Sequence, residues 1–202
     1  MGAIQSLKAW WQGIVSKDDL EAWDGQPSPE DARDDARALK KLRAELHVFV
    51  LATFSFLGSE VAERISRRVH KAARSEDGEV MEPASALRDG LMGDFFGGRR
   101  TPFVFLFEAR YTENAQIILG KVCDAYGIKD RFQFDEAIQG AMPLKVLGLF
   151  KNWLIERSFD LIIFDTGGDE YCGFLVPLID CKEAISRLSA MEIQATSEPE
   201  EA

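Results

Sequence analysis

Histidine and cysteine are scarce in this sequence of 202 residues, which contains two histidines and three cysteines. His47 and His70 are too few for most histidine-rich metal sites, so no metal or other cofactor is predicted. The number of cysteines is odd and no Cys-x-x-Cys pair occurs, which indicates reduced thiols in a cytoplasmic protein rather than a disulfide framework. Cys172 is expected to be a buried, unreactive thiol.

A basic excess and a long apolar run are also missing. The net charge of −10 argues against general nucleic-acid binding, because phosphate contacts require clustered Lys and Arg. The longest apolar-biased run, Leu46 to Leu57, is shorter than the roughly 20 residues of a membrane-spanning helix. No secretory signal pattern is evident, and we expect a cytoplasmic protein with a folded core.

Familiar catalytic signatures do not occur either, whether Ser-His-Asp, H-E-x-x-H or a dinucleotide fingerprint. The glycine-rich segment Gly93 to Thr101 approaches a phosphate-binding loop, but Arg99 and Arg100 stand where that motif needs Lys and then Ser or Thr. The segment also leads into a predicted strand rather than a helix. We therefore interpret it as a loop with two exposed arginines.

The two ends of the chain are predicted to be appendages. Residues 1–15 form an amphipathic arm with Trp10 and Trp11, and residues 16–29 an acidic linker. Gly2 and Ser6 match the M-G-x-x-x-[ST] pattern of myristoylation. Lipidation, a helix resting on a membrane or partner, and an arm packed on its own domain all stay open. Residues 193–202 are predicted to be a disordered acidic tail.

Between these ends, the periodicity predicts one α+β domain over residues 30–192. A small, mainly antiparallel sheet, which ends in a C-terminal β-hairpin, is expected to be covered by helices and preceded by an N-terminal helical segment. Ser28 and Pro29 begin a helix that Gly58 ends. The next helix carries a basic cluster, for which a solvated surface and a partner site are both open. The cluster comprises Arg64, Arg67, Arg68, Lys71 and Arg74.

Further elements follow along the chain. Residues 75–101 are predicted to be irregular and Pro102 to Glu108 a buried strand. Thr112 is expected to cap a helix, and Phe132 to Phe134 form a short strand or an extended loop. A helix begins at Pro143. The predicted cap of the last helix pairs Asp180 with Glu183 in a capping-box-like arrangement.

The strongest local signal lies in Phe159 to Ile179, where two apolar runs flank Gly167 and Gly168. A two-residue type I′ turn needs positive φ at both central positions, which glycine adopts without steric cost. These residues therefore predict a β-hairpin in which Asp165 faces Glu170, and the strand at Phe103 is expected to join the hairpin. The other facing pairs would be Phe164 with Tyr171 and Thr166 with Asp169.

The carboxylates of this hairpin are the candidate site. Asp165, Asp169 and Glu170, with Tyr171 beside them, could bind a cation, hold a raised pKa or receive a basic partner. Facing like charges destabilise a sheet, although a solvated tip makes the repulsion small and a purely structural role is open. For the protein as a whole, we favour a non-enzymatic protein-interaction module. A metal-dependent or acid–base enzyme and a peripheral membrane protein are the alternatives.

The segment Pro102 to Val176 resembles a bacterial family known as a domain of unknown function. In that family an aromatic strand ends in an acidic residue, and a later helix precedes a hairpin of the form D-[TS]-x-[GS]-D-x-Y. The family has no known activity, so the resemblance implies none. The matching residues are Phe105, Phe107 and Glu108, then Trp153 and Leu154, then Asp165, Thr166, Gly168, Asp169 and Tyr171.

A second resemblance is to the SUKH superfamily of immunity and interaction proteins, whose members have a G-G-D-type turn between two sheet strands. Gly167, Gly168, Asp169 and Tyr171 match that turn. The resemblance implies a non-enzymatic binding protein. An immunity or stress-associated role is one form that the favoured interaction module could take.

Overall fold

The computed structural model describes residues 28–96, 98–108, 114–134, 138 and 141–199. The chain divides into residues 1–37 and 38–202, and the described strands all belong to the second unit. Residues 1–27, which were predicted to form the arm and most of the linker, lie outside the described residues, as does Thr112. Within the described ranges, no helix is both long and apolar enough to cross a bilayer.

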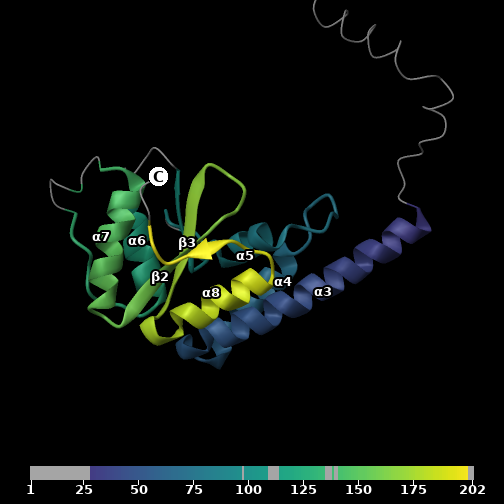
Figure 1. Cartoon of the computed structure of the whole chain (residues 1–202), viewed down its shortest axis with the longest axis horizontal. Coiled ribbons are helices and arrows are strands. Elements are labelled where there is room, and N and C mark those ends of the chain that lie inside the picture. The colour runs from purple at the N-terminus through teal and green to yellow at the C-terminus, as the bar shows by residue number, and fades with distance from the viewer. Residues whose placement is uncertain (1–27, 97, 109–113, 135–137, 139–140, 200–202) are drawn as a thin grey trace, which may run out of the picture. The chain divides into compact units, whose positions relative to one another are not determined.

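One antiparallel sheet lies at the centre of the second unit, with the strand order β1-β3-β2-β4 (Figure 1). The β2–β3 hairpin supplies the two central strands, and β1 joins β3 as the sequence predicts. The α+β class with an antiparallel sheet is thereby confirmed. The strands are β1 (Phe105–Glu108), β2 (Phe159–Phe164), β3 (Glu170–Pro177) and β4 (Ala195–Thr196).

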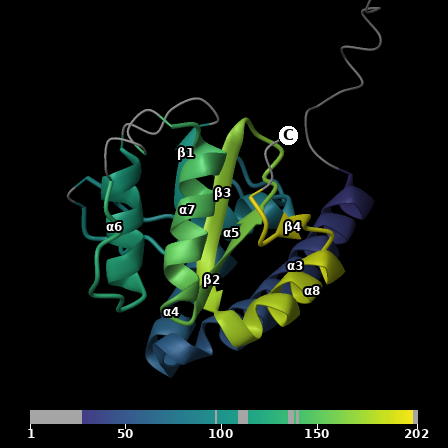
Figure 2. The same cartoon turned by 60° about the vertical axis from the view of Figure 1, so that its left-hand side comes forward.

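Helices cover both faces of this sheet (Figure 2). α6 and α7 lie on one face, whereas α8, α5 and the C-terminal part of α3 lie on the other, and α4 packs on α5. A short 3-10 turn, η1 (Ser55–Leu57), follows α3, and a second one, η2 (Leu178–Asp180), precedes α8. The helices are α3 (Pro29–Phe54), α4 (Ser59–Ala72), α5 (Pro83–Leu91), α6 (Ala115–Ala125), α7 (Pro143–Ile155) and α8 (Cys181–Ala190).

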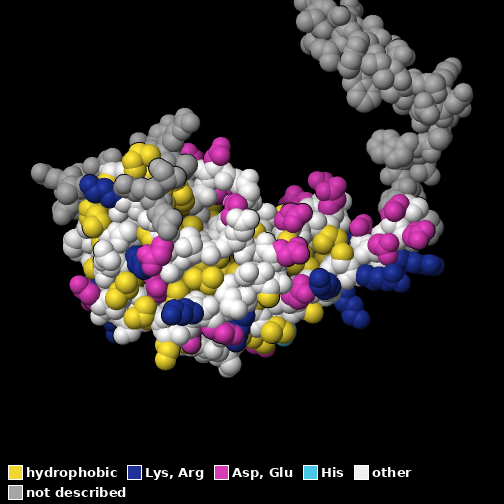
Figure 3. Space-filling model, viewed as in Figure 1, with side chains coloured by type: hydrophobic (Ala, Val, Ile, Leu, Met, Phe, Trp, Pro, Cys, Tyr) yellow, Lys and Arg dark blue, Asp and Glu magenta, His cyan; other side chains and the backbone are white. Residues whose placement is uncertain are grey.

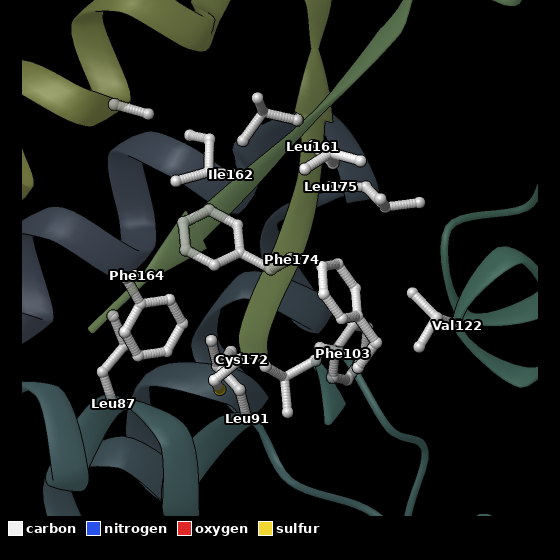
Figure 4. Close-up of a cluster of buried hydrophobic side chains, with 14 of the residues drawn as sticks. Leu87, Leu91, Phe103, Val122, Leu161, Ile162, Phe164, Cys172, Phe174 and Leu175 are labelled. Atoms are coloured by element: carbon white, nitrogen blue, oxygen red, sulfur yellow. The ribbon is translucent and has the colours of Figure 1, made fainter. Parts of the chain in front are cut away.

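Phe174 of β3 is the centre of the core on the α3 side of the sheet. Its ring centroid lies 6.1 Å from that of Phe49 and 5.5 Å from that of Phe54, both on α3, and 5.9 Å from that of Phe164 on β2. Aromatic pairs at such distances contribute about 0.5–1.5 kcal/mol each beyond burial. The close-up in Figure 4 shows Leu87 of α5 beside Phe164 in the same cluster. The packing therefore ties α3 and α5 to the two central strands.

Several local signals act as predicted. Ser28 Oγ accepts a hydrogen bond from the Asp31 N–H at 3.1 Å, and Asp31 Oδ2 accepts one from the Ser28 N–H at 3.2 Å. This reciprocal pair satisfies donors that the start of α3 would otherwise leave unpaired. Gly58 has a φ of 96°, a conformation that glycine adopts readily, and it separates α3 and η1 from α4. Pro143 begins α7.

The prediction that residues 75–101 are irregular is wrong, because α5 occupies Pro83–Leu91. Pro83 stands in its first turn, and Leu87 and Leu91 follow at a helical spacing of four residues and are fully buried. A helix of nine residues is marginal by itself and gains its stability from packing. The strand predicted over 102–108 covers only Phe105–Glu108, and residues 132–134 form a loop rather than a strand.

Two further predictions need correction. Asp180 precedes α8, but its side chain forms no capping hydrogen bond. Because Asp180 also belongs to η2, its backbone has near-helical angles (φ −94°, ψ −7°), whereas an N-cap residue normally has extended angles. Glu183 instead accepts a hydrogen bond from Arg187 Nε at 3.0 Å. The tail is not wholly disordered, since Ala195 and Thr196 pair with β2 and cover an edge that would otherwise be open.

Candidate functional site

The β2–β3 loop is built around Asp165 and Gly167. The N–H of Gly167, which has a φ of 75°, donates to Asp165 Oδ1 at 2.7 Å. This contact is an Asx-type turn, in which the aspartate side chain bonds the backbone two residues on. The backbone N–H of Asp165 donates a second hydrogen bond, to the carbonyl oxygen of Gln194 at 2.9 Å. Asp165 is therefore held by its own loop and by the segment that leads into β4.

The predicted type I′ turn and its register are wrong. Phe164 pairs with Cys172 rather than with Tyr171, so Asp165 and Glu170 do not face each other. Of the two loop glycines, Gly167 alone has a positive φ, whereas a type I′ turn requires it at both positions. A shift of one residue moves every side chain to the opposite face of the sheet. Relative to β2, the shift places Cys172 and Glu170 on the face that carries Phe164 and leaves Tyr171 on the other face.

Glu170 forms an ion pair on that face. Arg88 Nη1 of α5 donates to Glu170 Oε1 at 2.8 Å, and Thr166 Oγ1 donates to the same oxygen at 3.2 Å. Arg88 Nε also donates to Asp89 Oδ1 at 2.8 Å. Burial by itself would lower the pKa of Arg88, but the hydrogen bonds to both carboxylates outweigh it and raise the pKa. The guanidinium group thus stays charged and joins α5 to the start of β3.

A pair of facing carboxylates does exist, but between different strands from those predicted. Glu108 at the end of β1 is the cross-strand partner of Glu170 at the start of β3. Like charges in such positions repel each other, and Arg88 offsets part of that repulsion through its ion pair with Glu170. Within the described residues Glu108 is exposed and forms no ion pair, so it adds negative charge to this end of the sheet.

A cavity of about 440 Å³ opens beside the loop. Its volume lies within the range of ligand pockets. Asp169 is exposed next to it and does not line it. Figure 3 shows acidic side chains, in magenta, at this end of the hairpin. The cavity wall includes Asp165, Gly168, Glu170, Tyr171, Gln194 and Thr196, so it contains three of the four residues that the sequence nominates.

The described residues around the loop contain neither a metal-ligand cluster nor a thiol of lowered pKa. Among the described residues, no group of three or more His, Cys, Asp or Glu side chains is placed to hold a metal ion. Burial, together with the smaller effect of the Glu170 charge, raises the pKa of the neighbouring Cys172 thiol, which is therefore unreactive at neutral pH. His47 lies on α3, where its Nδ1 is 2.7 Å from Ser66 Oγ of α4. The loop thus offers carboxylates, hydroxyl groups and an aromatic ring.

Sequence reasoning missed the residues that complete the site from elsewhere in the chain. Arg88 lies 82 residues before its partner Glu170, in a segment expected to be irregular. Gln194 belongs to the expected disordered tail. Pro83 with Leu87 and Leu91 at helical spacing was the one available signal for α5. No signal in the sequence indicated that β4 would return to Asp165.

Comparison with known proteins adds no relationship: the sequence matches no protein-family model and no curated protein, and no solved structure matches it.

Proposed function

We propose that this chain is a protein-interaction module whose recognition site is the acidic end of the sheet. The site comprises the cavity beside the β2–β3 loop, with Asp165, Glu170 and Tyr171 in its wall and Asp169 at its rim. The partner presents a basic side chain. The observation that carries the proposal is that one cavity gathers carboxylate oxygens and an aromatic ring, the groups that recognise an ammonium or guanidinium.

Charge supports the same choice of partner. Asp89, Glu108, Asp165, Asp169 and Glu170 all lie at this end of the sheet, and Arg88 is the cation paired with two of them. An incoming Lys or Arg would find unpaired carboxylates at Asp165 and Asp169, since neither forms an ion pair in the described part of the chain. Complementary charge of this kind favours specificity and rapid association.

A double substitution tests the proposal. Asp165→Asn and Asp169→Asn remove two charges, while the amide introduced by Asp165→Asn keeps an Oδ1 acceptor for the Gly167 N–H. Tagged wild-type and variant proteins are used to recover partners from the native cell, and any recovered protein is then purified and titrated. Glu76→Gln with Asp77→Asn is the matched control, because it removes two charges from an exposed turn.

The expected result is a purified partner that binds the wild type and the control with equal affinity and the Asp165/Asp169 variant more weakly. The loss should be about tenfold, the effect of losing two solvent-exposed ion pairs. Equal affinity of all three proteins would overturn the proposed site.

A further inference from the structure

The basic side chains of α4 lie on a single face of the helix. Successive residues in an α-helix are rotated by about 100°, so the positions of Arg64, Arg67, Arg68 and Lys71 fall within an arc of about 100°. The buried side of α4, which includes Ile65 and Val69, lies opposite. Arg68 is half-buried and the other three are exposed, as is Arg74 just beyond the end of the helix.

Arg68 brings a second segment to this face. Its Nη1 donates to the Thr101 carbonyl oxygen at 2.9 Å, and its Nη2 donates to the Met92 carbonyl oxygen. Its guanidinium carbon lies 5.8 Å from the centroid of the Phe103 ring. These contacts hold the loop before β1 against α4. The loop carries Arg99 and Arg100, both exposed.

The guanidinium groups are close enough to influence one another. Burial lowers the pKa of Arg68, and the charges of Arg100 and Arg64 lower it further, with Asp94 acting in the opposite direction. Asp94 Oδ2 accepts a hydrogen bond from the backbone N–H of Arg100 at 2.9 Å. Its single charge therefore compensates only part of a cluster that gathers cations from both α4 and the loop.

Among the described residues, the exposed cations of this face form no ion pair, although the exposed Glu60 and Glu63 lie one helical turn before Arg64 and Arg67. These cations are Arg64, Arg67, Lys71, Arg99 and Arg100, in a sequence that contains 34 acidic and 24 basic residues. Mutual repulsion between these cations is unfavourable, and a bound anion offsets it through its attraction to each of them.

We propose that the outer face of α4, together with Arg99 and Arg100, is a docking surface for an acidic protein segment. The surface is separate from the site at the hairpin and does not depend on it. From Arg64 to Lys71 the helix advances about 10 Å, which an extended peptide of about three residues spans. Nucleic acids and anionic membranes extend far beyond this length, and the net charge of −10 on the chain opposes the approach of such large polyanions.

Binding of a fluorescein-labelled peptide of eight glutamates, followed by anisotropy at low salt, tests this inference. The variant is Arg64→Gln/Arg67→Gln/Lys71→Gln, and Arg99→Gln/Arg100→Gln is a second variant outside the helix. The matched control removes three other exposed cations through Lys121→Gln, Lys129→Gln and Lys145→Gln. A labelled octanucleotide of single-stranded DNA and phosphatidylserine vesicles are the competing probes.

We expect the wild type and the control to bind the peptide equally, with affinity that falls as salt is added. The triple α4 variant should bind it about tenfold more weakly, which corresponds to the loss of three exposed ion pairs. The loop variant should show a smaller loss. Tighter binding of the octanucleotide or the vesicles than of the peptide would overturn the choice of partner. Peptide binding that is absent, or equal in the variants and the wild type, would overturn the surface.

Discussion

A pair of glycine-to-alanine substitutions tests the packing that positions the site. Gly90 lies in α5 where this helix crosses α4, and a Cβ atom added there would come within 2.4 Å of Val69 Cα. Gly120 lies in α6, and a Cβ atom added there meets nothing within 4 Å. The chemical change is the same, so the difference between the two variants isolates the contact between α4 and α5.

The expected magnitudes have opposite signs. Alanine is favoured over glycine inside a helix by about 1 kcal/mol, which should raise the free energy of unfolding of Gly120→Ala by that amount. Overpacking a core costs typically about 1–3 kcal/mol. At Gly90 the obstacle is the Val69 backbone, which no side-chain rotation can remove, so we expect the upper end of that range. After the helical gain, Gly90→Ala should be less stable than the wild type by about 2 kcal/mol.

Urea denaturation followed by far-ultraviolet circular dichroism measures both changes in the free energy of unfolding. The melting temperatures should move in opposite directions, by about 2–4 °C for each kcal/mol. A Gly90→Ala protein as stable as the wild type would refute the close crossing of α4 and α5. Destabilisation of Gly120→Ala by a similar amount would show that the cost does not come from that crossing.

Three other perturbations have defined outcomes. Gly173→Ala should destabilise by more than about 3 kcal/mol, because its Cβ would lie 2.4 Å from the Ile162 carbonyl oxygen within the sheet; thermal unfolding measures this. Glu198→Gln should lower the free energy of unfolding, measured by urea denaturation, by about 1 kcal/mol. The reason is that Lys151, whose side chain is only 10% exposed, loses its partner carboxylate at 2.5 Å. Lys151→Met should cost less, because it removes the buried charge. Burial raises the pKa of Cys123 to about 12, so unfolded thiols ionise first and the free energy of unfolding should fall as pH rises from about 8.5 towards 12. Cys123→Ala should weaken that pH dependence, and an unchanged dependence would contradict the assignment.

Where a structural feature depends on neighbours along the chain, the sequence was sufficient to predict it. Ser28 with Asp31 begins α3, and Gly58 separates it from α4, because capping hydrogen bonds and positive φ angles involve only nearby residues. The α+β class follows from the alternation of helical periodicity with strand-like runs. Asp165, Glu170 and Tyr171 could also be nominated in advance, because they lie within a few residues of one another around a short loop.

The geometry of that loop, in contrast, was decided by the tertiary structure. Gly167 and Gly168 favour a two-residue turn locally, yet the Asp165 N–H bonds to Gln194 beside β4, and the register moves by one residue. α5 forms because Leu87 and Leu91 are buried by distant parts of the chain.

The partner of Glu170 depends on the same long-range packing. Arg88 lies 82 residues before Glu170 in the sequence. It reaches this carboxylate only because α5 packs against α4 and lies beside β3. The sequence by itself thus determined the fold class, most helix starts and the acidic character of the hairpin. The tertiary structure decided the register and the ion pair, because both depend on hydrogen bonds and contacts between segments that no local pattern connects.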